Sequence, residues 1–239
     1  MVPVHLKIAV ALLSTAMLGG CQGNRCSTQI RVPLDRQYVL DEHSDRPINV
    51  SLPGDQPFNI HIKQSCQNPG ADGRAEGKSD TNATGQALCS AEVAEGGSAA
   101  GEFTIGHRIA NQTDSPQDLA IEIDFQWLQS LHTSTDPKPD TLACSNLEIL
   151  VLDAKGKTLA TIPVLTTDSD QARASAELRD HRKFSVSLEP QIHYDIILAG
   201  KVEAKSATGQ QASALLEVKN LKIDLSFTPT QKETKQTVP

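Results

Sequence analysis

Apolar and polar residues alternate with a period of two along much of the chain. In the stretch 119–127, every odd position is apolar: Leu119, Ile121, Ile123, Phe125 and Trp127. Alternation of this length is typical of an antiparallel strand with one buried face. Shorter strand-like runs occupy 31–34, 48–52, 58–63, 103–109, 147–152, 158–162 and 184–188. The glycine turn at 153–157 predicts that the runs 147–152 and 158–162 form a hairpin.

The C-terminal part contains two longer strand-like runs, 192–205 and 213–227, on either side of a turn at 206–211. In the second run, the apolar residues fall on even positions up to Val218 and on odd positions from Leu221 onward. Even and odd positions of a regular strand face opposite sides of the sheet. The change therefore predicts a bulge or bend near Lys219 and Asn220.

Together these runs predict an all-β fold, an antiparallel β-sandwich of Greek-key or jelly-roll type over residues 26–227. Only 168–182 predicts a short helix, with Asp168 or Ser169 as its N-cap. The polar, glycine-rich segments 67–87 and 94–101 and the proline-containing segment 132–141 predict loops. The polar tail 228–239 predicts disorder.

The N-terminus has the layout of a secretory signal peptide. One lysine, Lys7, precedes an apolar run that begins at Ile8, and small residues follow. This run is shorter than the roughly 20 apolar residues of a transmembrane helix. The segment Leu18-Gly19-Gly20-Cys21 resembles the lipobox of bacterial lipoproteins. The resemblance implies cleavage after residue 20 and a diacylglycerol thioether on Cys21, followed by a short membrane tether, 21–25.

Position 22 bears on the location of such a lipoprotein. In proteins with this motif, Asp after the lipidated cysteine favours retention in the inner membrane. This chain has Gln22, so the resemblance implies attachment to the outer membrane if the host has two membranes. Cleavage would remove Lys7 and no acidic residue, so the formal charge would fall from −7 to −8. A mildly acidic chain is not expected to bind nucleic acid.

With Cys21 assigned to lipid, four cysteines remain, an even number that predicts two disulfides in an exported chain. Three connectivities are open, and we favour Cys66–Cys89, which are closest in sequence. This leaves Cys26–Cys144 as the second pair. The cysteines form no CxxC pair, so structural zinc is not expected.

The polar segment 67–87 offers a weak calcium candidate. Asp80, Asn82 and Thr84 alternate and precede a glycine, as in the first half of a calcium loop. The twelfth position of the loop is Ala91 rather than a bidentate acid, so the alternative is a polar turn. We expect no other cofactor.

Catalytic motifs are not apparent. His107 lies among alternating apolar residues and is expected in the core, and His181 is expected in a charged loop. A hydrolase would have to bring His107, His181 or His193 beside an acid and a serine. Eight aromatic residues, most at core positions, leave few for an exposed sugar-stacking surface.

These observations favour a lipid-anchored envelope protein that is not an enzyme. We expect a structural, binding or assembly component that contacts another envelope protein through loops or a strand edge. The alternative is a ligand- or calcium-binding module that uses the segment 67–87, and a secreted hydrolase is the less favoured third reading.

Overall fold

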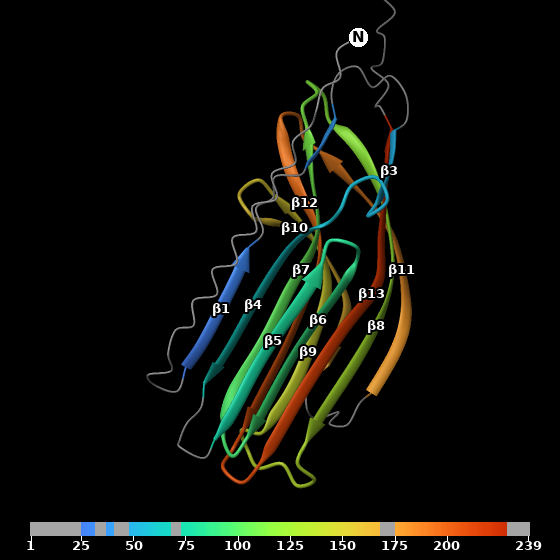
Figure 1. Cartoon of the computed structure of the whole chain (residues 1–239). Coiled ribbons are helices and arrows are strands. Elements are labelled where there is room, and N and C mark those ends of the chain that lie inside the picture. The colour runs from blue at the N-terminus through green and yellow to red at the C-terminus, as the bar shows by residue number, and fades with distance from the viewer. Residues whose placement is uncertain (1–24, 32–36, 41–47, 68–72, 168–174, 229–239) are drawn as a thin grey trace, which may run out of the picture.

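A computed structural model describes residues 25–31, 37–40, 48–67, 73–167 and 175–228. These residues form an elongated β-sandwich whose long strands run along its length (Figure 1). The predicted signal peptide, Cys21, most of the tether, and the tail from 229 lie outside the described residues. Within them, the strands are β1 (Arg25–Arg31), β2 (Gln37–Leu40), β3 (Ile48–Leu52), β4 (Asn59–Gln67), β5 (Arg74–Asn82), β6 (Gln86–Ala94), β7 (Gly97–Asn111), β8 (Gln117–Thr133), β9 (Leu142–Asp153), β10 (Thr158–Thr167), β11 (Ser175–Leu188), β12 (Ile192–Ser206) and β13 (Gln211–Thr228).

The strands form two sheets, which confirms the predicted all-β sandwich. Sheet A has the order β1-β4-β7-β12-β9-β10, with β2 beside β7, and sheet B has the order β11-β8-β13-β6-β5, with β3 beside β13. All pairings are antiparallel except that of β2 with β7. From β6 to β13 the chain changes sheet at every connection except the β9–β10 hairpin, which was predicted. The two long C-terminal strands therefore lie in different sheets.

The alternating apolar residues line the space between the sheets. On β8 the odd positions Leu119, Ile121, Ile123 and Phe125 are at most 1% exposed, and the even positions face solvent. Tyr38 of sheet A stacks on Phe227 of sheet B, with ring centroids 5.6 Å apart. This ring pair connects the two sheets at the end of the sandwich where β2 pairs with β7 and β3 pairs with β13.

The predicted bulge in β13 is confirmed. The pairing of β13 with β8 shifts between Lys219 and Lys222, and Asn220 has a φ of 56°. The Leu221 amide donates to the Gly85 carbonyl at 3.0 Å, so the β5–β6 turn lies against the bulge. One edge of β13 pairs with β6 before the bulge and with β3 after it. The bulge therefore marks the position where β13 changes its partner.

Two of the predicted loops are strands. The segment 67–87 contains β5 and the start of β6, and 94–101 contains the start of β7. A Cβ on Gly77 would overlap the carbonyl oxygens of Ala100 and Ser65, and one on Gly101 would overlap that of Lys78. The small residues thus permit close approach of the two sheets rather than loop flexibility.

The predicted helix is wrong over residues 175–182, which belong to β11; residues 168–174 lie outside the described part. This strand pairs with β8 without a break from Ser175 to Leu188. Cross-strand pairing outweighs local helix propensity here. The Arg179 guanidinium contacts the Asp124 carboxylate at 2.6 Å, and the Lys183 ammonium contacts Glu122 at 2.8 Å.

The predicted disulfide pairings are also wrong. Cys89 is a free thiol, fully buried on β6, so it is not joined to Cys66. Burial raises the pKa of this thiol. Cys26 on β1 and Cys144 on β9 are separated by β4, β7 and β12. Four strand spacings amount to about 19 Å, whereas the Cα atoms of a disulfide lie within about 7 Å of each other.

Candidate functional site

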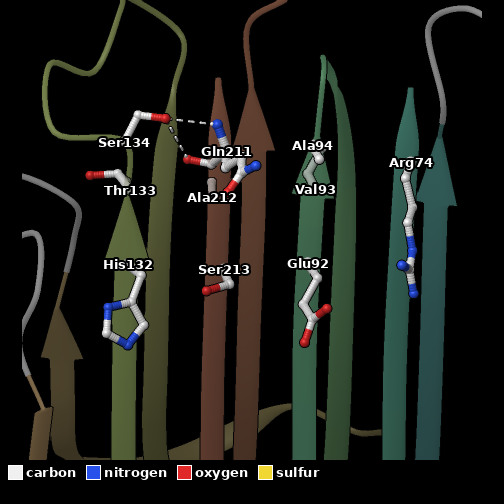
Figure 2. A pocket seen from close by; sticks show the side chains of 10 residues that line it. All are labelled: Arg74, Glu92, Val93, Ala94, His132, Thr133, Ser134, Gln211, Ala212 and Ser213. Atoms are coloured by element: carbon white, nitrogen blue, oxygen red, sulfur yellow. Dashed lines mark hydrogen bonds between the residues drawn. The ribbon is translucent and has the colours of Figure 1, made fainter. Parts of the chain in front are cut away.

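An open pocket of about 330 Å³ lies on the solvent-facing side of sheet B. Its residues come from four neighbouring strands, β8, β13, β6 and β5, near the end of the sandwich where residues 95–96 and 207–210 connect the sheets (Figure 2). The lining residues are Arg74, Glu92, Val93, Ala94, His132, Thr133, Ser134, Gln211, Ala212 and Ser213. The site is thus a hollow in a sheet face rather than a cavity of the core.

Strand register places three polar residues in one row across this pocket. Ser213 of β13 is paired with His132 of β8 on one side and with Glu92 of β6 on the other. Figure 2 shows Ser213 between the longer side chains of His132 and Glu92. The short Ser213 side chain therefore forms the bottom of the pocket, and the longer side chains of His132 and Glu92 form its two polar sides. Glu76 of β5 continues the row beyond Glu92.

Some polar groups of the site form hydrogen bonds within the protein, and others do not. His132 Nε2 and Ser130 Oγ are 2.8 Å apart, and the Gln211 amide donates to Ser134 Oγ at 2.9 Å. Among the described residues, neither the Glu92 carboxylate nor the Ser213 hydroxyl has a hydrogen-bond or ion-pair partner. These two groups are therefore available to a bound molecule.

Basic and acidic side chains also meet at the β5 side of the pocket. The Glu76 carboxylate contacts the Lys78 ammonium at 2.9 Å and the Arg74 guanidinium at 3.4 Å. The hydrogen bond from Lys78 is the main reason that the pKa of Glu76 is lowered. Arg74 keeps donors free, because it meets Glu76 through a single long contact and three-quarters of its side chain is exposed.

A serine–histidine pair borders the pocket. Ser130 and His132 form a serine–histidine pair, but in the described part of the chain no carboxylate contacts the other nitrogen of His132. Such an acid fixes the tautomer of the histidine in a catalytic triad. The pair is also exposed to water, where electrostatic stabilisation of a transition state is weak.

The histidines considered for a hydrolase are not brought together. His107 lies in the core on β7, 1% exposed, as expected. His181 lies on the outer face of β11, with Nε2 at 3.3 Å from Glu122 and Nδ1 at 3.9 Å from Asp124. His193 lies on β12, which pairs with β7 in sheet A, three residues along the ladder from the position opposite His107 and in the sheet that does not contain His181.

The calcium candidate lies at the β5–β6 turn. Asn82 Oδ1 accepts hydrogen bonds from the Thr84 amide, the Thr84 hydroxyl and the Gln86 amide, at 3.0, 2.8 and 3.1 Å. The Asn82 side-chain oxygen therefore stabilises the turn by hydrogen bonds to nearby groups of the chain, as Asn side chains commonly do. Asp80 lies two residues earlier on β5 and is exposed. In the described ranges, His, Cys, Asp and Glu residues form no group of three that could hold a metal ion.

A second hollow, of about 560 Å³, lies on sheet A near the same end of the sandwich. Ser65, Ser98 and Ala100 are small outward positions on adjacent strands, and Glu203 and Lys205 stand beside them on β12. Sequence reasoning missed both hollows, because each depends on the register of four strands. The run of small residues at 97–101 is a local signal, but it lies in the segment 94–101, for which the sequence alone predicts a loop.

The comparisons with known proteins give no family assignment. No family model and no curated protein matches the chain. Among solved structures, the enzymatically active domain of bacteriophage CBA120 tailspike protein 4 is 14% identical, with a TM-score of 0.22; the match covers 84% of this chain and 19% of that one. A carbohydrate-binding module of the β-sandwich superfamily is 8% identical, with a TM-score of 0.23 and coverage of 70% and 74%.

The CBM22-1 xylan-binding domain of Paenibacillus barcinonensis Xyn10C is 9% identical, with a TM-score of 0.17 and coverage of 71% of this chain and 86% of that one. These TM-scores are too low to transfer a function. The described residues also contain no helix with the length and apolarity needed to cross a membrane.

Proposed function

We propose that this chain is a lipid-anchored envelope protein that acts by binding another envelope protein and has no catalytic activity of its own. The anchor is the diacylglycerol thioether on Cys21, and Gln22 favours the outer membrane in a host with two membranes. The binding surface is the pocket on the outer face of sheet B, around Ser213.

The supporting observation is a contrast within that face. On the β11–β8 side, two acids are held by basic side chains: Arg179 makes two contacts with Asp124, at 3.0 and 2.6 Å, and Lys183 pairs with Glu122. At the pocket, Glu92 and Ser213 have no partner among the described residues. A carboxylate and a hydroxyl that are neighbours in a hollow and have no internal partner are suited to hydrogen bonding with a bound molecule.

A protein partner fits the dimensions of this surface. The pocket is open, and exposed polar side chains of β5, β6, β8 and β13 surround it, so a loop or strand of another protein could lie across the strands. Aromatic side chains, which stack on sugar rings, are absent from the pocket lining. Hydrogen bonds and charge therefore have to supply the specificity.

Co-purification from native membranes tests the binding proposal. The full lipidated chain should retain a specific protein that is lost with Glu92→Lys. Asp118→Lys is the matched control, because Asp118 is an exposed acid on the same sheet face at the other end of β8. Equal recovery of the partner with both variants would contradict the assignment of the surface.

Metabolic labelling with radioactive palmitate tests the anchor separately. The wild-type chain should carry the label and sediment with membranes, and Cys21→Ser should abolish both. A labelled Cys21→Ser variant would exclude lipidation at this residue without bearing on the binding surface.

A further inference from the structure

The pairing of β1 with β4 places two cysteines opposite each other. Cys26 and Cys66 are direct partners in this antiparallel ladder, flanked by the pairs Arg25–Gln67 and Ser27–Ser65. Directly opposed residues of antiparallel strands have Cα atoms about 4.5–5.5 Å apart. This separation falls within the range that a disulfide spans. Cys66 is itself disulfide-bonded.

The other described cysteines are not suitable partners for Cys66. Cys89 is a free thiol. Cys144 lies on β9, and β7 and β12 separate that strand from β4. Three strand spacings amount to about 14 Å, twice the Cα separation that a disulfide tolerates. The opposite position on β1 is the one that meets the geometric requirement.

We propose that Cys26 and Cys66 form a cross-strand disulfide. The two thiols lose two protons and two electrons as the sulfur–sulfur bond forms. A small-molecule or protein disulfide accepts them by thiol–disulfide exchange and leaves as two thiols, so the reaction balances. Such oxidants act in exported compartments. This inference does not depend on the proposed binding surface.

The bond would fix the edge strand β1 to the body of sheet A. β1 pairs with β4 alone within the described residues, so hydrogen bonds along one side hold it in place. If Cys21 is lipidated, as proposed above, only residues 22–25 separate the lipid from the disulfide. The extended chain between Cys21 and Cys26 spans about 17 Å. The disulfide would therefore hold the β1–β4 edge close to the membrane.

Peptide mapping of the full chain without reduction tests the pairing. Free thiols are first alkylated in denaturant, and the protein is then digested with trypsin. Cleavage after Arg25 and Arg31 releases residues 26–31, cleavage after Lys63 and Arg74 releases 64–74, and Cys21 stays in a third peptide. We expect 26–31 linked to 64–74. Alkylated Cys26, or Cys66 linked to the Cys21 peptide, would overturn the proposal.

Single substitutions provide a second readout. Cys26→Ser should make Cys66 reactive toward the alkylating reagent, and Cys66→Ser should do the same for Cys26, while Cys144→Ser should leave both protected. Both bond-breaking variants should lower the thermal midpoint to the same extent, because each removes the same bond. Protection of Cys66 in the Cys26→Ser variant would overturn the pairing.

Discussion

Charged side chains on the outer face of sheet B are arranged in pairs between strands. Asp124 of β8 accepts two bonds from Arg179 of β11, at 3.0 and 2.6 Å. The Arg179 hydrogen bond is the largest reason that the pKa of Asp124 lies below its usual value of 3.8. Because surface pairs of this kind contribute little individually, their effect is better measured through pH than through stability at one pH.

Asp124→Asn is expected to change how stability depends on pH. A carboxyl whose pKa is lower in the folded state contributes stability above its unfolded pKa and loses it as pH falls through the folded pKa. The variant should therefore be less stable than wild type at neutral pH, and the difference should disappear in acid, below the folded pKa. Urea unfolding between pH 7 and pH 2 measures this.

The control for this titration is Asp118→Asn, an exposed acid on the same face of β8 with no ion pair among the described residues. Its effect should stay small throughout. A difference between wild type and Asp124→Asn that persists unchanged at the lowest pH would contradict the assigned pairing.

Gly77 tests how closely the sheets approach. A Cβ at this position would meet the backbone carbonyls of Ala100 and Ser65, which cannot rotate away as a side chain could. Gly77→Ala should lower the free energy of unfolding by about 1–3 kcal/mol. Gly54→Ala is the control, because its Cβ would meet only the Ser51 carbonyl, at an ordinary 3.5 Å. Equal stability of the two variants would show that the sheets are farther apart here.

At the scale of elements, the bulge in β13 lies where one edge of this strand stops pairing with β6 and begins to pair with β3. Lys219 pairs with Gln126 and Lys222 with Asp124, so Asn220 and Leu221 face the single residue Phe125 of β8. Asn220 adopts the left-handed conformation that Asn tolerates better than most residues. The extra residue is what reverses the parity of the apolar positions.

Two deletions distinguish the bulge from the regular strand. Deleting Asn220 should leave Leu221 and the residues after it facing the core, because it restores simple alternation; the chain should fold with a modest loss. Deleting Lys222 should turn Ile223, Leu225 and Phe227 toward solvent. Since each of these side chains contributes about 1.5–3 kcal/mol by its burial, this variant should not fold. Circular dichroism melting compares them, and similar melting would contradict the register.

The β5–β6 turn gives another test, because Asn82 accepts three hydrogen bonds there. Asn82→Ala should lower the free energy of unfolding by about 1–3 kcal/mol, and the loss should be the same with and without millimolar calcium. Thr81→Ala, one residue earlier, is the control. Stabilisation of the wild type by calcium, lost in Asn82→Ala, would instead support the calcium-binding alternative.

Sequence reasoning succeeded where one strand carries its own signal. The stretch around Ile121 and Ile123 alternates because one face is buried, and the parity change before Leu221 follows from the bulge alone. Sequence reasoning failed at β5 and the start of β7. Glycine and alanine occur there because the opposite sheet lies too close for larger side chains, and this cannot be recognised from one strand alone. The pocket also could not be predicted, because His132, Ser213 and Glu92 become neighbours only through strand pairing.

At the scale of the whole molecule, the sandwich presents two hollowed sheet faces near one end. The pocket of sheet B and the hollow of sheet A both lie beside the connections at 95–96 and 207–210. The formal net charge of the chain is −7, and acidic and basic side chains alternate on both sheets, as in the ion pairs Lys63–Glu102 on sheet A and Lys183–Glu122 on sheet B. Recognition is therefore expected to depend on local hydrogen bonding rather than on a long-range field.

Site-specific photo-crosslinking in native cells tests the central claim that the sheet B pocket binds another envelope protein. A benzophenone amino acid placed at Ser213 should give a discrete crosslinked product that mass spectrometry identifies as an envelope protein, and Glu92→Lys should remove it. The same probe at Asp118 should give none. Absence of a product at position 213, or an equal product at both positions, would contradict the account.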